Sequence, residues 1–194
     1  MNWSRSTCST TRSTLPSIGA IREIRQSGGV RDTGGVSKRS AGILLFRVSD
    51  TTPLVLVVHP GGPFWKNKDA GAWSVPKGEY ELDEDARAAA MREFAEETGM
   101  SLAEHELMPL GEVRQRNGKL VTAWAVEGDF DERSLRSNEF ELEWPPRSGR
   151  RQSFPEVDRA LWCDAETARE KLNPAQTAFV DRLLELLRAQ GRIP

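Results

Sequence analysis

The apolar positions of this chain fall into short runs separated by turn residues, a pattern that predicts strands. The run at residues 41–48 is continuous and strand-prone, and residues 50–53 after it are typical of a turn. The dipeptide Asn117-Gly118 lies between two further runs and favours a tight β-hairpin. In all, we expect strands at residues 41–48, 54–59, 73–75, 110–115, 120–127 and 160–163.

One helix is predicted near the middle of the chain, over residues 83–98. Its first turn is acidic, which favours the positive end of a helix dipole, and Asp83 is the expected N-cap. Several alanines, which are strong helix formers, follow. Gly99 stands directly after the helix, at the usual position of a C-terminal cap.

A second helix is predicted at the C-terminal end of the chain. Asn173 is the expected N-cap, Pro174 occupies the first helical position and Gln176 the third. The apolar stripe of this helix comprises Phe179, Leu183, Leu186 and Leu187. Strands with interspersed helices predict an α/β layered domain, from which residues 128–156 form a long excursion.

Composition restricts the class of protein. The 194 residues are 38% apolar and 29% charged, as expected of one globular domain. No run approaches the 18 apolar residues that would indicate a transmembrane helix. Two cysteines, Cys8 and Cys163, do not make a disulfide framework, so we expect a reducing, cytoplasmic location.

The net charge of −2 is the sum of two unequal parts. Residues 1–40 hold seven basic and two acidic residues, a charge of +5, and the other 154 residues hold 20 basic and 27 acidic, a charge of −7. Residues 1–38 are rich in Ser, Thr, Gly and Arg and are predicted to be a disordered leader. The leader is either a consequence of a misassigned start codon, with Val36 as the true start, or a targeting segment. Residues 39–194 are the predicted folded domain.

Three carboxylates lie on one face of the predicted middle helix. Glu93, Glu96 and Glu97 fall within an arc of about 100° on a helix, where like charges repel. A bound cation would neutralise them, and hard carboxylate oxygens suit Mg²⁺ or Mn²⁺. The alternative is a solvated acidic helix face. His59 and His105 are too few and too widely spaced for a zinc site.

The spacing around these carboxylates is specific. Gly78 is followed after five residues by Glu84 and, after seven more, by Arg92-Glu93; the series ends with apolar Phe94, then Glu96-Glu97, Gly99 and apolar Met100. Seven fixed residues would coincide about once in 10⁸ placements. This series resembles the Nudix box. The resemblance implies a Nudix-like α/β/α sandwich with a mixed β-sheet and a loop-helix-loop metal site, and hydrolysis of a nucleoside diphosphate linked to another moiety with Mg²⁺ or Mn²⁺.

The resemblance also implies roles for single residues. Glu93, Glu96 and Glu97 would bind the metal together with the backbone carbonyl of Gly78. Arg92 would pair with a neighbouring glutamate, and Glu84 would orient that network. Glu93 is the expected proton acceptor for the attacking water, and Glu156 is the alternative. Lys77, just before the box, would meet a substrate phosphate. For Glu156 and Lys77 the alternative is a solvated surface residue.

The substrate is less well defined. Trp65 or Trp124 would stack on a base, unless these side chains fill the core. Arg147, Arg150 and Arg151 follow a Pro-Pro pair and would close over a polyphosphate, the alternative being an exposed basic loop.

Residues 40–42 and 73–78 are similar to the predicted NTP pyrophosphohydrolase branch, which is close to dinucleoside-polyphosphate hydrolases. Dinucleoside-polyphosphate hydrolases often have a tyrosine some way past the box, but the only tyrosine of this chain, Tyr80, lies inside the box. This departure from the family pattern weakens a diadenosine-polyphosphate assignment. A non-catalytic nucleotide-binding or regulatory module and an RNA 5′-end pyrophosphohydrolase are the alternatives. The net charge of −7 on the folded region disfavours nucleic acid as a partner. The sequence leaves the oligomeric state open.

Overall fold

The computed structural model describes residues 38–102 and 106–194. The predicted leader, residues 1–38, lies outside these residues except for its last one. The elements, in chain order, are β1 (Arg39–Ser49), β2 (Thr52–Pro60), β3 (Lys77–Glu79), α1 (Ala86–Thr98), β4 (Met108–Arg114), β5 (Leu120–Glu127), η1 (Glu132–Ser134), β6 (Glu139–Glu143), β7 (Arg151–Pro155), β8 (Val157–Cys163), α2 (Ala165–Lys171), η2 (Pro174–Gln176) and α3 (Thr177–Ala189).

The main sheet has the strand order β4-β5-β1-β2-β8, with β3 paired to β1. β1 and β5 run parallel, whereas every other pair in this sheet is antiparallel, so the predicted mixed sheet is confirmed. The Asn117-Gly118 hairpin between β4 and β5 also forms, with Gly118 at a φ of 84° that a glycine adopts without strain.

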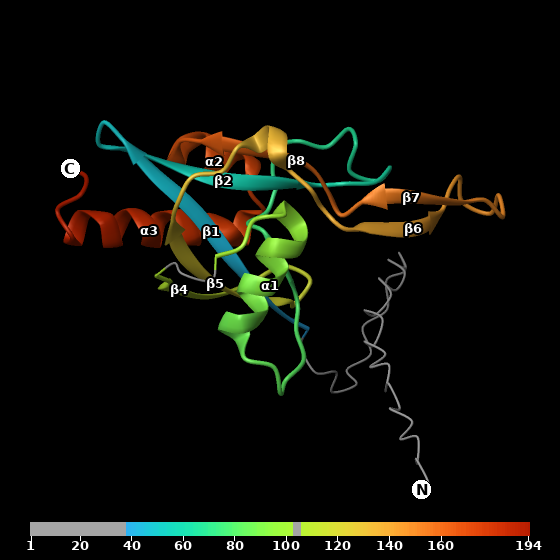
Figure 1. The fold of residues 1–194 in the computed structure, drawn as a ribbon, viewed down its shortest axis with the longest axis horizontal. Coiled ribbons are helices and arrows are strands. Elements are labelled where there is room, and N and C mark those ends of the chain that lie inside the picture. The colour runs from blue at the N-terminus through green and yellow to red at the C-terminus, as the bar shows by residue number, and fades with distance from the viewer. Residues whose placement is uncertain (1–37, 103–105) are drawn as a thin grey trace, which may run out of the picture. The chain divides into compact units, whose positions relative to one another are not determined.

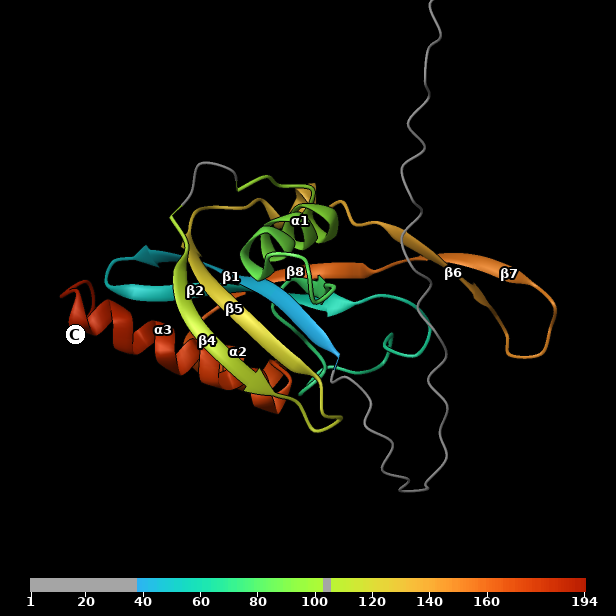
Figure 2. The same cartoon turned by 90° about the horizontal axis from the view of Figure 1, so that it is seen from below.

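Helices cover both faces of this sheet, as Figures 1 and 2 show, with α1 on one side and α2 and α3 on the other. The alternation of side chains along β1 serves both layers: Ile43 and Leu45 pack in the core beneath α1, and Leu44 and Phe46 pack in the core beneath α3. The stripe predicted for α3 is buried at Phe179, Leu183 and Leu187, while Leu186 is only partly buried. The α/β/α sandwich is therefore confirmed.

The strand predicted at residues 73–75 is wrong. This segment is inserted between β1 and β2, where the amide of Ile43 donates to the carbonyl of Pro76 and the amide of Val58 donates to the carbonyl of Ser74, both at 2.9 Å. Only isolated bridges form there, and the regular strand β3 begins at Lys77. The insertion spreads β1 and β2 apart and brings the chain to α1.

Two helix caps differ from the sequence prediction. Asp85 rather than Asp83 caps α1, and its side chain accepts from the amide of Ala88 at 2.8 Å. Asn173 is a cap as predicted, but of η2, and the side-chain oxygen of Gln176 accepts from the amide of Val75 at 2.9 Å instead of serving its own helix. Gly99 ends α1 in the left-handed conformation, as expected.

The excursion at residues 128–156 contains a second sheet. β6 and β7 pair with each other as an antiparallel hairpin, which extends away from the main sheet and from α1 in both views (Figures 1 and 2). The short helix α2 after β8 was not anticipated from the sequence, because its seven residues carry no apolar stripe. No helix of the described residues has the length and apolar character to cross a membrane.

Candidate active site

The site is built around the face of α1 that looks toward β3. Strand β3 places Gly78 against the helix so closely that a Cβ atom at this position would lie 1.7 Å from Oε2 of Glu93. One turn further along α1, Oε2 of Glu97 accepts the backbone amide of Lys77 at 2.8 Å. The backbone of β3 and the carboxylates of α1 thus form one packed unit.

Arg92 links the carboxylates of the box. Its Nη2 lies 3.1 Å from Oε1 of Glu84, and its Nη1 lies 2.6 Å from Oε1 of Glu93 and 3.5 Å from Oε1 of Glu96. Because α1 begins only after Asp85, Glu84 is outside the helix and can reach across to Arg92. Burial opposes the charge of Arg92, but the bonds to Glu93 and Glu84 raise its pKa above the ordinary value.

Two carboxylates of the helix are held where ionisation is costly. Burial raises the pKa of Glu97 to about 8, an effect opposed by Lys77 and reinforced by the charges of Glu93 and Glu156. Burial also raises the pKa of Glu93; Arg92 opposes this rise, and Glu96 and Glu156 add to it. Such a site favours either protons or a bound cation.

Glu156 joins this cluster from a distant part of the sequence. It stands between β7 and β8, and its backbone is fixed by bonds from its amide to the carbonyl of Asn138 and from the amide of Gly61 to its own carbonyl. Burial raises the pKa of the Glu156 carboxyl, and the nearby charge of Glu96 raises it further. The tertiary structure therefore brings this residue to the same acidic centre as the helix.

Comparison with known families agrees with this geometry. The NUDIX domain model matches residues 36–183, which is most of the chain. The chain belongs to the Nudix family. Membership implies pyrophosphohydrolase activity on nucleoside diphosphate-linked substrates, and the family is generally enzymatic and typically uses divalent metals. Among curated proteins no match is found.

Solved structures show the same Nudix fold. An Ap4A hydrolase of C. elegans in a binary complex is 18% identical, with a TM-score of 0.57 over 78% of this chain and 98% of its own. A mutT/nudix family protein of Listeria innocua is 16% identical, with a TM-score of 0.53 over 79% and 96%. The NUDIX domain of Shewanella oneidensis NrtR, complexed with ADP ribose, is 16% identical, with a TM-score of 0.52 over 79% and 90%. At these identities the likeness establishes the fold alone.

The donor set of the Nudix site fits a divalent cation. Over residues 38–102 and 106–194, no three His, Cys, Asp or Glu side chains form a ready-made cage for a metal. Mg²⁺ does not need one, because it keeps several waters and takes one or two carboxylates together with substrate phosphate oxygens. Glu93, Glu96 and Glu97 offer hard oxygens whose mutual repulsion a cation would relieve, beside the backbone of Gly78.

Of the predicted substrate residues, Lys77 is the one placed beside the carboxylates, since its charge acts on Glu97. Trp65 is partly buried against the core beneath α3, with Nζ of Lys68 4.5 Å from the centre of its ring. Trp124 is partly buried in the core beneath α1. The structure does not bring the arginines of the hairpin to the cluster: Arg147 lies in the turn between β6 and β7, and the exposed Arg151 pairs with Glu141 at 3.4 Å.

One anchor of the site was missed by sequence reasoning. His59 at the end of β2 is fully buried, with Nδ1 2.7 Å from Oδ1 of Asp158 and Nε2 2.9 Å from the carbonyl of Lys68. It ties the loop at residues 61–71 to the start of β8, two residues after Glu156. Nothing in the sequence signals this role, because the two partners are 99 and 9 residues away.

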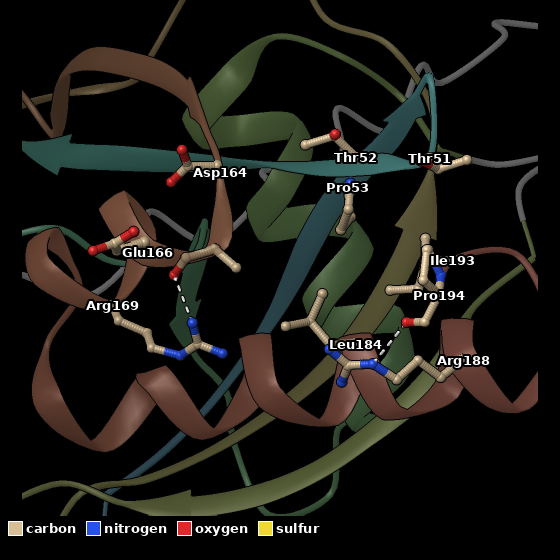
Figure 3. A pocket seen from close by; sticks show the side chains of 11 residues that line it. Thr51, Thr52, Pro53, Asp164, Glu166, Arg169, Leu184, Arg188, Ile193 and Pro194 are labelled. Atoms are coloured by element: carbon tan, nitrogen blue, oxygen red, sulfur yellow. Dashed lines mark hydrogen bonds between the residues drawn. The ribbon is translucent and has the colours of Figure 1, made fainter.

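A shallow hollow elsewhere on the molecule is not a competing active site. It has a volume of about 370 Å³ and lies between the β1–β2 turn, α2 and the end of α3 (Figure 3). Its arginines are already engaged: Arg169 pairs with Asp181, and Nε of Arg188 donates to the carbonyl of Pro194 at 3.1 Å. None of the box carboxylates lines it.

Proposed function

We propose that this protein is a Mg²⁺-dependent hydrolase of a pyrophosphate bond in a nucleoside polyphosphate or in a nucleoside diphosphate linked to another moiety. The observation that carries the proposal is the acidic centre of α1, where Glu93 lies against Gly78 and accepts from Arg92, Glu97 accepts from the amide of Lys77, and the charges of Glu96 and Glu156 act on Glu93. Mn²⁺ would serve in the same site, because it takes the same hard oxygen ligands.

The proposed metal ligands are Glu93, Glu96, Glu97 and the carbonyl of Gly78. A bound divalent cation would neutralise the pyrophosphate and lower the pKa of the attacking water. Arg92 would hold the rotamers of Glu93 and Glu96, and Glu84 would in turn hold Arg92, as the distances given above support. Lys77 would attract a phosphate group as a compact positive charge.

Two carboxylates are candidates for the proton acceptor. The sequence favours Glu93, but Arg92 donates to this carboxylate at 2.6 Å, which lowers its basicity. Glu156 accepts no side-chain hydrogen bond from the residues that the structure describes, and its pKa is raised by burial and by Glu96. We therefore propose Glu156 as the proton acceptor and Glu93 as a metal ligand.

Substrate recognition would involve surfaces beyond the acidic centre. Trp65 would form one side of the nucleotide-binding surface, because its loop is anchored by His59 and continues toward the box. Arg147 and Arg151 stay predicted contacts, and only for a substrate that extends onto the β6–β7 hairpin. The charge of the folded region continues to disfavour RNA.

A panel of nucleotides tests the proposal. Purified protein is incubated with Mg²⁺ and ATP, dGTP, Ap4A, ADP-ribose or triphosphorylated RNA, and the products are identified by mass. We expect release of phosphate, pyrophosphate or a nucleoside monophosphate from at least one member, abolished by EDTA and by Glu97→Gln. Glu185→Gln, an exposed change on α3, is the matched control. Tight nucleotide binding without product from any member would replace the proposal with the binding-module alternative.

A further inference from the structure

A short segment before β6, residues 136–138, bonds to the last turn of α1. The amide of Arg136 donates to the carbonyl of Thr98 at 3.2 Å. The amide of Asn138 donates to the carbonyl of Glu96, also at 3.2 Å. The last carbonyls of a helix have no partner within the helix, so a segment from elsewhere in the chain can bind them. The segment is thereby attached to the turn of α1 that carries two of the box carboxylates.

The same segment holds the backbone around Glu156. The carbonyl of Asn138 accepts the amide of Glu156 at 2.8 Å. Oγ of Ser137 accepts the amide of the next residue, Val157, at 3.0 Å. Asn138 thus bridges the backbone of Glu96 and the backbone of Glu156 through its own amide and carbonyl. The separation between the helix and Glu156 therefore depends on where this segment lies.

Close contacts restrain the backbone on both sides of this arrangement. On the helix side, a Cβ atom on Gly99 would lie 3.2 Å from Cβ of Arg136, so the glycine that ends α1 also packs against the segment. On the other side, a Cβ atom on Gly61 would collide with the carbonyl oxygen of Pro155. The amide of Gly61 donates to the carbonyl of Glu156 at 2.9 Å. The backbone at Glu156 therefore has little room to shift while these bonds are made.

Ser137 contributes a side chain to what is otherwise a set of backbone bonds. Its Oγ accepts the amide of Val157 and donates to the carbonyl of Asn138 at 3.1 Å, so the hydroxyl joins the segment to the start of β8. Val157 is only 4% exposed, and a buried amide that loses its acceptor is costly. Removal of the hydroxyl would therefore force the backbone beside Glu156 to move or to admit water.

We propose that Ser137 is a positioning residue for the reaction, which holds Glu156 in place relative to the carboxylates of α1. The inference rests on the proposed function, in which Glu156 takes the proton of the attacking water. The charge of Glu156 raises the pKa of Glu93 and of Glu97, so its carboxylate already acts at the acidic centre. A proton acceptor works only within hydrogen-bond reach of the proton, directly or through one water. A misplacement of about 1 Å can cost about 10²-fold in rate, so the hydroxyl that fixes this backbone controls turnover.

A double-mutant cycle tests this role through turnover. Ser137→Ala should lower kcat about tenfold and leave KM and the Mg²⁺ requirement within about twofold, because the hydroxyl acts only on the backbone beside Glu156. In a Glu156→Gln background the same change should lower kcat by less than about twofold, since no acceptor remains to be positioned. Ser137→Thr keeps the hydroxyl and should restore the natural kcat. Ser153→Ala removes a hydroxyl that donates to Glu139 at 2.6 Å on the neighbouring hairpin and is the matched control.

Amide hydrogen exchange measures the same link without turnover. In Ser137→Ala the amides of Glu156 and Val157 should exchange at least about tenfold faster by NMR, because a local opening no longer breaks the bond to the hydroxyl. The amides of α3 should exchange at the natural rate, which shows that the fold as a whole is kept. Ser153→Ala should leave the exchange of both Glu156 and Val157 unchanged.

The outcomes separate the inference from the proposed function. An active natural chain with an unchanged kcat in Ser137→Ala would overturn the inference and leave the proposed function standing. Equal losses of kcat in the natural and Glu156→Gln backgrounds would show a purely structural role and overturn it as well, as would unchanged exchange at the two amides. A natural chain that hydrolyses no nucleotide would refute the proposed function, and the positioning role of Ser137 would fall with it.

Discussion

The side chain of Glu93 packs directly against the backbone of Gly78. The carboxylate of Glu93 fills the position that a side chain at residue 78 would take, with Oε2 only 1.7 Å from an ideal Cβ. Strand β3 can therefore approach α1 only with a glycine here. The requirement is one of close approach and not of backbone angle, since Gly78 is not among the residues with a positive φ.

The change Gly78→Ala should displace the carboxylate of Glu93 while keeping the fold, because the end of a glutamate side chain can rotate away. We expect kcat/KM to fall at least about tenfold, as for other losses of an oriented metal ligand. The melting temperature should change by less than about 3 °C. Enzyme kinetics and thermal unfolding monitored by circular dichroism check both statements. Full activity in Gly78→Ala would show that Glu93 does not need this position.

Arg92→Lys should raise the Mg²⁺ concentration required for half-maximal activity by about 10- to 100-fold. Lysine keeps the charge but cannot bridge Glu84, Glu93 and Glu96 at once, because its three donors sit on a single nitrogen. A metal titration of the initial rate measures the effect. Arg87→Lys is the matched control, since Arg87 lies on the same helix and is exposed. An unchanged metal requirement would contradict the orienting role of Arg92.

Glu97 should make the metal-free protein less stable as pH rises. Its pKa is about 8 in the folded state against an ordinary value of 4.5, so between these values the unfolded chain releases a proton that the folded chain retains. The free energy of unfolding is therefore highest below about pH 4.5, as far as Glu97 contributes to it, and falls progressively toward pH 8. Thermal unfolding in EDTA at pH 6 and pH 8 measures the slope.

The matched comparison for that slope is Glu97→Gln, which carries no titrating proton. At pH 8 the variant should melt at least about 3 °C above the natural protein in EDTA. Mg²⁺ should reverse the order, because the metal binds the ionised carboxylate of the natural protein and stabilises its folded state. An identical pH slope in both proteins would show that Glu97 titrates normally.

Glu156→Gln should lower kcat by about 10²- to 10⁴-fold with little change in the Mg²⁺ requirement, because a proton acceptor acts in the chemical step. Glu93→Gln should instead change the metal requirement. The acidic limb of the profile of log kcat against pH should be absent in Glu156→Gln and present in Glu93→Gln. If Glu93→Gln loses the acidic limb and Glu156→Gln changes the Mg²⁺ requirement, Glu93 is the proton acceptor.

Much of the main sheet could be predicted from local pattern. The runs that became β1, β2, β5 and β8, and the hairpin between β4 and β5, were found because apolar runs and Asn-Gly turns act over a few residues. The segment at residues 73–75 failed for a tertiary reason. Its backbone bonds are divided among β2, the chain around the end of α2 and the side chain of Gln176, so an apolar, strand-like sequence forms no continuous ladder.

Local pattern does not predict hydrogen-bond partners that lie far apart in the chain. Gln176 matches a capping position, yet its side chain binds Val75, 101 residues earlier, because the start of the last helix packs against the inserted segment. His59 carries no sequence signal for the two backbone regions that it joins. Such contacts depend on the sheet being assembled first, and no periodicity in the chain encodes them.

The family, the α/β/α class and the carboxylates on one helix face could all be predicted from the sequence, because box spacing and helical geometry are local properties of the chain. Three further relationships required the assembled fold: Glu84 reaches Arg92 from outside the helix, Glu156 adds its charge to Glu93 and Glu97, and Lys38 and Lys119 both pair with Glu79. These relationships cross between strands and loops up to about 80 residues apart. Their electrostatic consequences follow from burial and close approach, which exist only once the sheet and its two helical layers have packed.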